Sequence, residues 1–282
     1  MKNAKKLLSI LLALVMLVLC GLPALAEEPL HYTVIGDSIG YGSGIINSRE
    51  ACYGKIVADT NGYVYANHSV PGHTTGDLLT VLEDEAVREN LRSTDIVSLT
   101  IGGNNFLRGN IMKMFFKWIT GDVSFMEEIA DGAYADLQSI VSILRELNPD
   151  AKVLLQNLYN PQVGVIKEFY DVGLVALNAV FAAVAAENEG FVYLIDVQSA
   201  FGSDANPYIA ADRIHPNALG NEAIARAVLE KLFDLGLGEN TEPVINTPGK
   251  DFVPAFSLES FFEAIRNFFL TIWYKISGIM PY

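Results

Sequence analysis

An aspartate and a histidine three residues apart, Asp212 and His215, stand near the end of a chain in which Gly36-Asp37-Ser38 stands near the beginning. A hydroxyl that attacks an ester needs a base to take its proton, and that base needs an acidic partner to hold its tautomer. Asp212 and His215 supply the base and its partner in one short turn, and Ser38 follows the first apolar run of the body of the chain. These residue types predict a serine hydrolase with Ser38, Asp212 and His215 as catalytic residues.

Short apolar runs rich in β-branched residues alternate with longer amphipathic stretches, which is typical of βαβ units around a parallel sheet. We expect strands at His31–Ile35, Tyr63–Ala66, Asp95–Ile101, Lys152–Asn157 and Phe191–Asp196. We expect helices at Glu50–Thr60, Thr75–Asn90, Met126–Leu147, Ile166–Glu189 and Ala218–Leu235. Asn148-Pro149 ends the third of these helices, and Asn217 can cap the fifth. The pattern predicts one doubly wound α/β domain with three layers.

Four polar or glycine-containing fragments follow the expected strands. They are Gly36-Asp37-Ser38 after the first, Val70-Pro71-Gly72 after the second, Gly102-Gly103-Asn104-Asn105 after the third and Asp212 to His215 in the loop after the fifth. Open α/β sheets bind ligands outside the carboxyl ends of their strands. Each fragment alone also fits an ordinary turn or a loop-tying amide. Their convergence predicts a single active site, in which Gly72 offers a backbone N–H and Asn104 a side-chain donor.

The order serine, glycine, asparagine, Asp-x-x-His resembles the SGNH hydrolases, the GDSL-type esterase and lipase superfamily, across roughly Leu30 to Leu235. The resemblance implies a flavodoxin-like three-layer α/β/α sandwich with a parallel sheet of about five strands, and chemistry that needs no cofactor. The catalytic residues that it implies are Ser38, Asp212 and His215, with Ser38, Gly72 and Asn104 as the oxyanion hole. The family often has Asp after that asparagine, whereas this chain has Asn105. The hydrogen bonding of the loop that carries Asn104 is therefore expected to differ.

An apolar insertion from Phe106 to Phe125 separates the third expected strand from its helix. It stands next to the expected active site, so it can form a lid or an acyl-chain groove. In that case Phe106, Phe115 and Trp118 are substrate-binding residues. The same composition also fits an extra helix packed into the core.

Residues 237–251 form a polar stretch with Pro243, Pro248 and Gly249, which is typical of a linker. Residues 252–282 follow with Phe, Ile and Trp at helical spacing, and we expect an amphipathic aromatic-rich helix. Arg266 and Lys275 interrupt it, so it falls short of the ~20 apolar residues that a membrane span needs. It can lie along a membrane surface as a peripheral anchor, or dock on the domain or a partner.

Residues 1–26 have the pattern of a secretory signal peptide: a basic start, a charge-free run from Leu7 to Leu22, and Ala24-Leu25-Ala26 as a cleavage site. An uncleaved membrane anchor is the alternative. Cleavage leaves a hydrolase domain at 27–236 and moves the formal charge from −14 to −17. This acidity argues against nucleic acid as a partner. Cys52 is then the single cysteine, so no disulfide framework is expected in a protein that is secreted or associated with a bacterial cell envelope.

The ester substrate stays open at this point among lipids or lysophospholipids, acetylated polysaccharides and small soluble esters. The apolar insertion and the aromatic C-terminal stretch favour acyl chains. A protein of another class, a non-catalytic envelope protein that uses this scaffold for binding or adhesion, is the alternative. The histidines lack the paired spacing of a zinc site, so no metal is expected.

Overall fold

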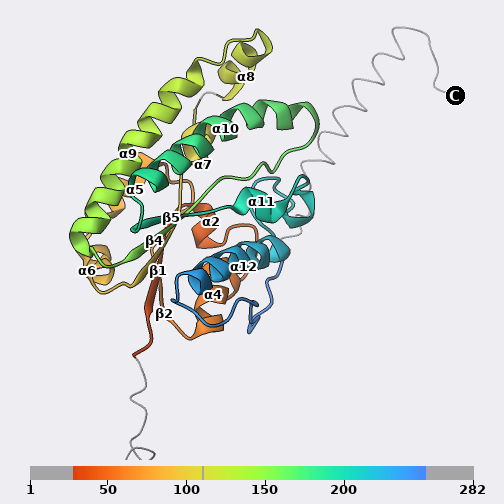
Figure 1. Ribbon diagram of the computed structural model, residues 1–282. Coiled ribbons are helices and arrows are strands. Elements are labelled where there is room, and N and C mark those ends of the chain that lie inside the picture. The colour runs from red at the N-terminus through yellow and green to blue at the C-terminus, as the bar shows by residue number, and fades with distance from the viewer. Residues whose placement is uncertain (1–27, 110, 252–282) are drawn as a thin grey trace, which may run out of the picture.

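A computed structural model describes residues 28–109 and 111–251; the expected signal peptide and C-terminal helix lie outside the described residues. Five parallel strands form one sheet in the order β2-β1-β3-β4-β5 (Figure 1). The strands are β1 (His31–Gly36), β2 (Val64–Asn67), β3 (Ile96–Thr100), β4 (Lys152–Gln156) and β5 (Val192–Ile195). Each begins and ends within one residue of its expected position, and the predicted flavodoxin-like fold class is confirmed.

Helices cover both faces of the sheet (Figure 1). One layer contains α5 (Thr75–Val81), α6 (Glu85–Arg92), α9 (Phe125–Leu147) and α10 (Gly164–Glu187). The other contains α2 (Ser38–Tyr41), α4 (Tyr53–Asn61), α11 (Val197–Phe201) and α12 (Ala218–Asp234). Shorter pieces are α3 (Ser48–Ala51), α7 (Gly103–Leu107), α8 (Ile111–Ile119) and a 3-10 helix, η1 (Asn206–Tyr208).

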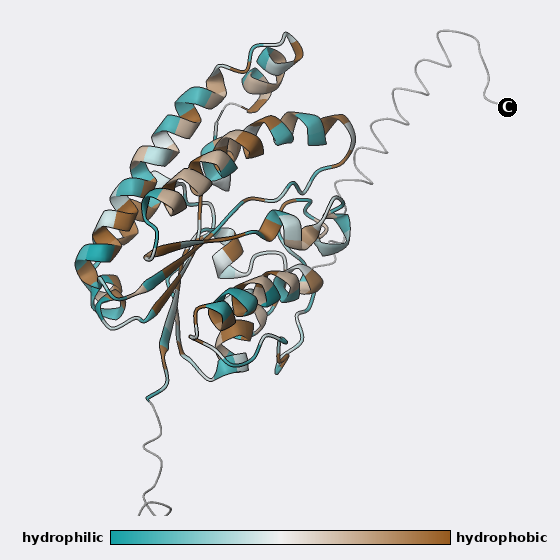
Figure 2. Cartoon of the chain, viewed as in Figure 1, coloured by the Kyte–Doolittle hydropathy of each residue, from teal (hydrophilic) through white to brown (hydrophobic). Residues whose placement is uncertain are grey.

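The central strands divide their side chains between two cores, because successive residues of a strand point to opposite faces. In β4, Val153 and Leu155 pack into the core beneath α9 and α10, whereas Leu154 packs into the core beneath α4 and α12. All three are fully buried. This two-sided burial explains why the strands in the middle of the sheet are largely apolar instead of strictly alternating (Figure 2).

Two of the expected helices are each broken in two. The stretch expected at Glu50–Thr60 divides into α3 and α4 because Cys52 adopts an extended conformation, with ψ of 159°. The backbone N–H of Tyr53, at the start of α4, then donates to Asn221 of α12 at 3.0 Å. The stretch expected at Thr75–Asn90 divides where the Asp84 carboxylate caps α6 by accepting from the Ala86 N–H at 2.8 Å. Both breaks provide polar partners for a new helix start.

One helix among the described residues, α10, is long and apolar enough to cross a membrane by length and composition. Its Phe169, Leu177, Phe181 and Val184 side chains are buried against α9 and the sheet. One face of α10 is therefore part of the core of the domain, whereas Val165 and Val175 on the rest of the helix are exposed.

Candidate active site

Ser38 is positioned by a sharp turn at the carboxyl end of β1. Gly36 has φ of 131°, and a Cβ atom built on it would lie 1.8 Å from the carbonyl oxygen of Thr100 at the end of β3. The next residue, Asp37, donates its backbone N–H to that same oxygen at 2.8 Å. Only glycine can occupy this position, because the left-handed conformation and the close approach both exclude a side chain. Ser38 then starts α2 and is 8% exposed.

The Asp37 carboxylate caps α2, accepting from the Ile39 N–H at 3.0 Å. Burial raises the pKa of Asp37 to about 7, against the opposing effects of the Ile39 N–H, the Thr100 hydroxyl and His215.

Asp212 and His215 form a hydrogen-bonded pair in the loop before α12. The Nδ1 atom of His215 lies 2.6 Å from Oδ2 of Asp212, while Oδ1 accepts the backbone N–H groups of Ile214 and His215 at 3.0 Å each. Burial opposes ionisation of Asp212, but these three hydrogen bonds hold its pKa below the ordinary value. An ionised carboxylate can only accept, so the proton lies on Nδ1, and Nε2 is left as the basic nitrogen.

Three carbonyl groups of this loop are tied to the rest of the domain. The carbonyl of Arg213 accepts from the Gln162 side chain, and that of Ile214 from the Tyr159 hydroxyl, both at 2.8 Å. The carbonyl of His215 accepts from the Ala210 N–H at 2.8 Å. The backbone that carries the imidazole is thus held from two sides, by the loop between β4 and α10, which contains Tyr159 and Gln162, and by Ala210, which follows η1.

Asn104 and Gly72 are brought together by a hydrogen bond from the Asn104 amide to the carbonyl of His73, at 2.9 Å. Asn104 is the second residue of α7, and Gly72 lies in the exposed loop after β2. The amide nitrogen carries two hydrogens, so one holds the Gly72–His73 loop and the second is left to donate to a ligand.

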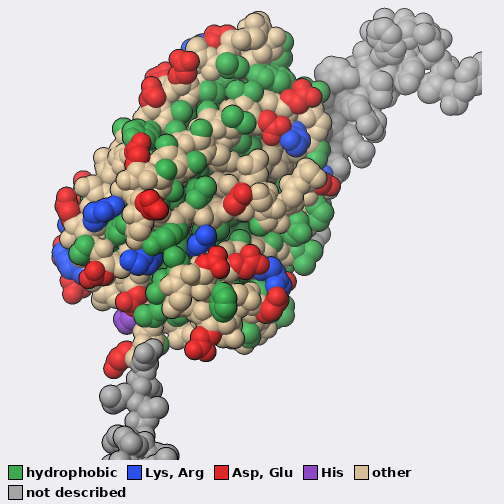
Figure 3. Space-filling view, viewed as in Figure 1, with side chains coloured by type: hydrophobic (Ala, Val, Ile, Leu, Met, Phe, Trp, Pro, Cys, Tyr) green, Lys and Arg blue, Asp and Glu red, His purple; other side chains and the backbone are tan. Residues whose placement is uncertain are grey.

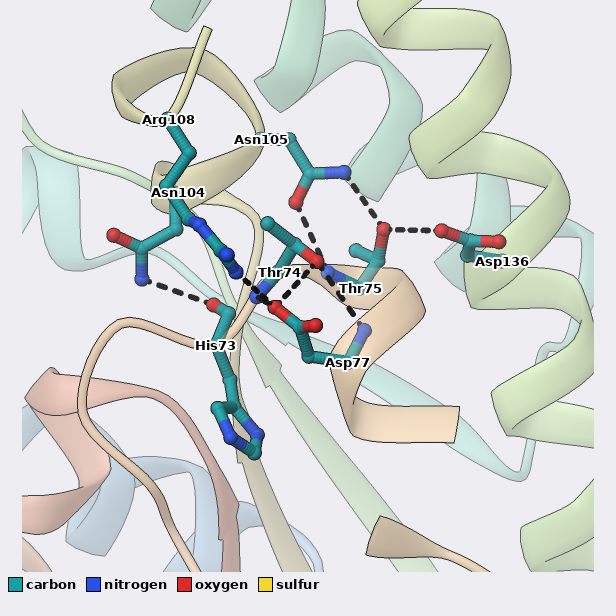
Figure 4. A network of polar contacts seen from close by, with 8 residues as sticks. All are labelled: His73, Thr74, Thr75, Asp77, Asn104, Asn105, Arg108 and Asp136. Carbon is teal, nitrogen blue, oxygen red and sulfur yellow. Dashed lines mark hydrogen bonds and ion pairs between the residues drawn. The ribbon is translucent and has the colours of Figure 1, made fainter. Parts of the chain in front are cut away.

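Asn105 makes a local network that depends on its being an amide (Figure 4). Its Oδ1 accepts from the Thr75 N–H at 3.0 Å, and its Nδ2 donates to the Thr75 hydroxyl at 2.7 Å. The hydroxyl in turn donates to Asp136 of α9 at 2.6 Å. A carboxylate at position 105 would compete with Asp136 for the one hydroxyl proton. Asn105 therefore suits the neighbouring aspartate, and the loop that carries Asn104 stays anchored to α5 and α9.

A cavity of about 80 Å³ opens beside Ser38 and Asn104. Its wall is mostly apolar. The residues that line it include Phe106, Leu107, Leu158, Leu174 and Leu177, together with Tyr159, Tyr170 and Ile214. The cavity therefore joins the ends of β1 and β3, helix α10 and the histidine loop in one site.

The three residues expected to bind substrate occupy two different places. Phe106 lines the cavity. Phe115 and Trp118 of α8 pack on Phe169, with ring centroids 5.4 and 5.7 Å apart, and Phe169 packs on Phe106 at 5.3 Å. Phe115 and Trp118 therefore contact the cavity wall from the side away from the cavity, through Phe169 of α10.

Sequence reasoning missed Tyr159, Gln162 and the α10 residues of the cavity wall. The available signal was the polar and aromatic run Asn157 to Gln162, which follows β4 and must lie at the same sheet edge as Ser38. Within residues 28–109 and 111–251, no group of three or more His, Cys, Asp or Glu side chains is placed to hold a metal ion.

This fold and site define a class, the three-layer hydrolases with a serine after the first strand. The profile of the GDSL-like Lipase/Acylhydrolase family matches residues 34–223, and the chain belongs to this family, which makes it an ester hydrolase. YpmR of Bacillus subtilis (strain 168) is 28% identical over 75% of this chain and 84% of its own. The spore germination lipase LipC of Bacillus licheniformis is 25% identical to this chain over 74% of this chain and 97% of LipC. The fold is similar to that of a lipase from a goat rumen metagenome, with a TM-score of 0.61 and 22% identity over 74% of this chain and 99% of the other.

The raised pKa of Asp37 predicts that the free energy of unfolding falls as the pH rises from about 4 to about 7. In that window the folded state retains a proton on Asp37 that the unfolded state releases. The stabilisation by this proton is therefore complete below pH 3.8 and is lost as the pH rises through about 7. Asp37→Asn keeps the cap and removes the titration. The free energy of unfolding of Asp37→Asn minus that of the wild type, both measured by urea denaturation, should increase by a few kcal/mol between pH 4 and pH 7.

Asp84→Asn is the matched control, because Asp84 also caps a helix with its carboxylate but is exposed. A difference between Asp37→Asn and the wild type that stays constant from pH 4 to pH 7.5 would contradict the assignment.

Proposed function

We propose that the protein hydrolyses carboxylic esters through Ser38, His215 and Asp212, with an oxyanion hole formed by Ser38, Gly72 and Asn104. The observation that carries the proposal is the 2.6 Å bond between His215 and an ionised Asp212, in a loop that shares a cavity with Ser38 and Asn104. A hydrogen-bonded Asp–His pair in a loop that lines the same cavity as a buried serine suits proton abstraction from the serine hydroxyl.

In the proposed mechanism, Nε2 of His215 accepts the Ser38 proton as Oγ attacks the acyl carbonyl. The backbone N–H groups of Ser38 and Gly72 and the free amide hydrogen of Asn104 stabilise the oxyanion, a contribution of roughly 10²–10³ in rate per donor. Asp212 stabilises the imidazolium. His215 then protonates the leaving alcohol, and a water molecule, activated by the same nitrogen, releases the acid from Ser38.

The substrate we propose is an ester with an acyl chain of several carbons, such as a lipid or lysophospholipid. The support is the apolar wall of the cavity beside Ser38, formed by Phe106, Leu158, Leu174 and Leu177. An acetyl group would leave most of this wall without contact, whereas each methylene buried there contributes about 0.8 kcal/mol.

Replacing the proposed nucleophile tests the mechanism. Ser38→Ala is expected to lower ester turnover by at least about 10³-fold and to abolish labelling by a fluorophosphonate probe. Thermal unfolding should change little, because the side chain is small and Ala fits the space. Labelling of the wild type alone supports the enzyme; a wild type that takes no label supports a non-catalytic binding protein on the same scaffold.

A panel of p-nitrophenyl esters from acetate to dodecanoate tests the substrate class. We expect kcat/KM to rise about fourfold per methylene until the cavity is filled. Leu174→Trp should fill the cavity and remove this preference while acetate is still hydrolysed. Val175→Trp is the matched control, since Val175 is the next residue of α10 and is 71% exposed. Acetate as the best substrate of the wild type would point instead to acetyl esters of carbohydrates.

We also infer that the protein is exported by residues 1–26 and held at a membrane surface by residues 252–282. The sequence patterns described above support both inferences. The chain carries a formal net charge of −14. On the face in Figure 3 the basic side chains are interspersed with acidic ones, so this face offers little attraction to anionic lipid. An anchor would therefore have to act through apolar contact.

Fractionation of expressing bacteria tests these two inferences together. The full chain should be found outside the cytoplasm and bound to the cell surface, whereas a chain ending at Asp251 should be released into the medium with unchanged turnover of a soluble ester. Retention of both forms in the cytoplasm would contradict export, and equal surface binding of both would contradict the anchor.

A further inference from the structure

Residues 237–251, here called the C-terminal strap, lie beyond the part of the chain that matches the family, which ends at residue 223. The strap runs along α4 and α12 (blue in Figure 1). Its first half is held by α4 and the turn after it: the Tyr63 hydroxyl donates to the carbonyl of Leu237 at 2.6 Å, and the Val244 N–H donates to the Thr60 hydroxyl at 3.0 Å. The Asn61 side chain accepts the N–H groups of Glu239 and Asn240. The composition is that of a linker, but the segment is bound to the domain.

The second half of the strap binds the loop that follows the α2 helix of Ser38. The Ile46 N–H donates to the carbonyl of Lys250 at 2.8 Å, and Ile45 forms an antiparallel bridge with Asp251. Asn47 accepts from the Lys250 N–H and donates to the carbonyl of Pro248. This loop therefore pairs with the strap over several residues.

Asp251 also binds the start of the helix that follows His215. Its Oδ1 accepts the N–H of Ala218, the first residue of α12, at 2.8 Å. The side chain of the α12 cap, Asn217, accepts the N–H of Gly220. Asp251 therefore accepts a second N–H group at the start of α12 that has no partner within the helix. A carboxylate at this position also interacts favourably with the helix dipole.

The Ser38 loop, the His215 loop and the strap are therefore each in contact with the other two. The carbonyl of Ser38 accepts the N–H of Ser43 at 2.9 Å, which holds the start of the loop against α2. Further along, a Cβ atom on Gly44 would lie 2.9 Å from Cβ of His215 and 2.3 Å from the carbonyl oxygen of Pro216. The loop thus runs directly against the histidine loop, and the strap holds both from outside.

We propose that the strap is part of the catalytic apparatus and that Asp251 is a positioning residue, which keeps the His215 loop in register with the Ser38 loop. The proposal rests on the proposed function of Ser38 and His215. Because the strap bridges the two loops, loss of the Asp251 carboxylate lets them shift relative to each other. Proton transfer is more sensitive to such a shift than acyl-chain binding is, because most of the apolar wall comes from other segments, among them Phe106, Leu174 and Leu177.

The experiment compares variants of the full chain on p-nitrophenyl butyrate. Asp251→Ala is expected to lower kcat on the order of fivefold with KM unchanged, because the histidine loop loses one of the restraints that align it with Ser38. Asp251→Asn keeps an acceptor oxygen and should retain kcat within about twofold. Gly249→Ala is an independent variant, because its Cβ would lie 2.9 Å from Cβ of Ala218 and push the strap off α12. It should reproduce the loss of kcat.

Asn240→Ala is the control for a purely stabilising role, since it loosens the strap at α4, away from the histidine loop. Wild-type kcat in both Asp251→Ala and Gly249→Ala, or an equal loss of kcat in Asn240→Ala at a matched melting temperature, would overturn the proposal. Failure of the proposed function is separate, because it would appear in the wild type as absence of fluorophosphonate labelling.

Discussion

The hydrogen bond from the Asp37 N–H to the carbonyl of Thr100 joins the carboxyl ends of β1 and β3, and the site depends on it. The chain leaves β1 for β2 on one side of the sheet and returns to β3 on the other, so a crevice opens between these strand ends. Ser38 and Asn104 leave the sheet on either side of that crevice. Since Gly36 lies against Thr100 with no room for a side chain, the distance between the two strand ends is set by the backbone itself.

The surroundings shift the pKa values of two aspartates of the site, Asp212 and Asp37, in opposite directions. Burial penalises the charged form of both, but Asp212 accepts three hydrogen bonds, including one from the imidazole, and its pKa stays low. Asp37 is more deeply buried, its Oδ1 accepts the Ile39 N–H, and its pKa rises to about 7. The first can therefore support a positive charge on His215, whereas the second serves the local geometry of α2.

The parts of the fold that were predictable are those with a strong local pattern, such as the buried strands and the Asn217 cap. The breaks at Cys52 and Asp84 were not, because helical periodicity continues through both and the compensating partner of Tyr53 comes from α12. The roles of Phe115 and Trp118 could not be separated from that of Phe106 by composition. The difference between lining a cavity and supporting its wall is set by Phe169, a residue of another helix. The strap has the composition of a linker, and its hydrogen bonds reach residues about 30 to 200 positions away.

By itself the sequence determined where the five strands lie and the predicted pairing of Asp212 with His215, because the apolar pattern of a strand and a three-residue spacing are local features of the chain. Only the tertiary structure decided that Tyr159 and Gln162 hold the histidine loop, that α10 forms the cavity wall, and that Asp251 binds the start of α12. Those relations join segments that are distant in sequence. They follow from how whole helices and loops pack on the sheet edge, which no local spacing encodes.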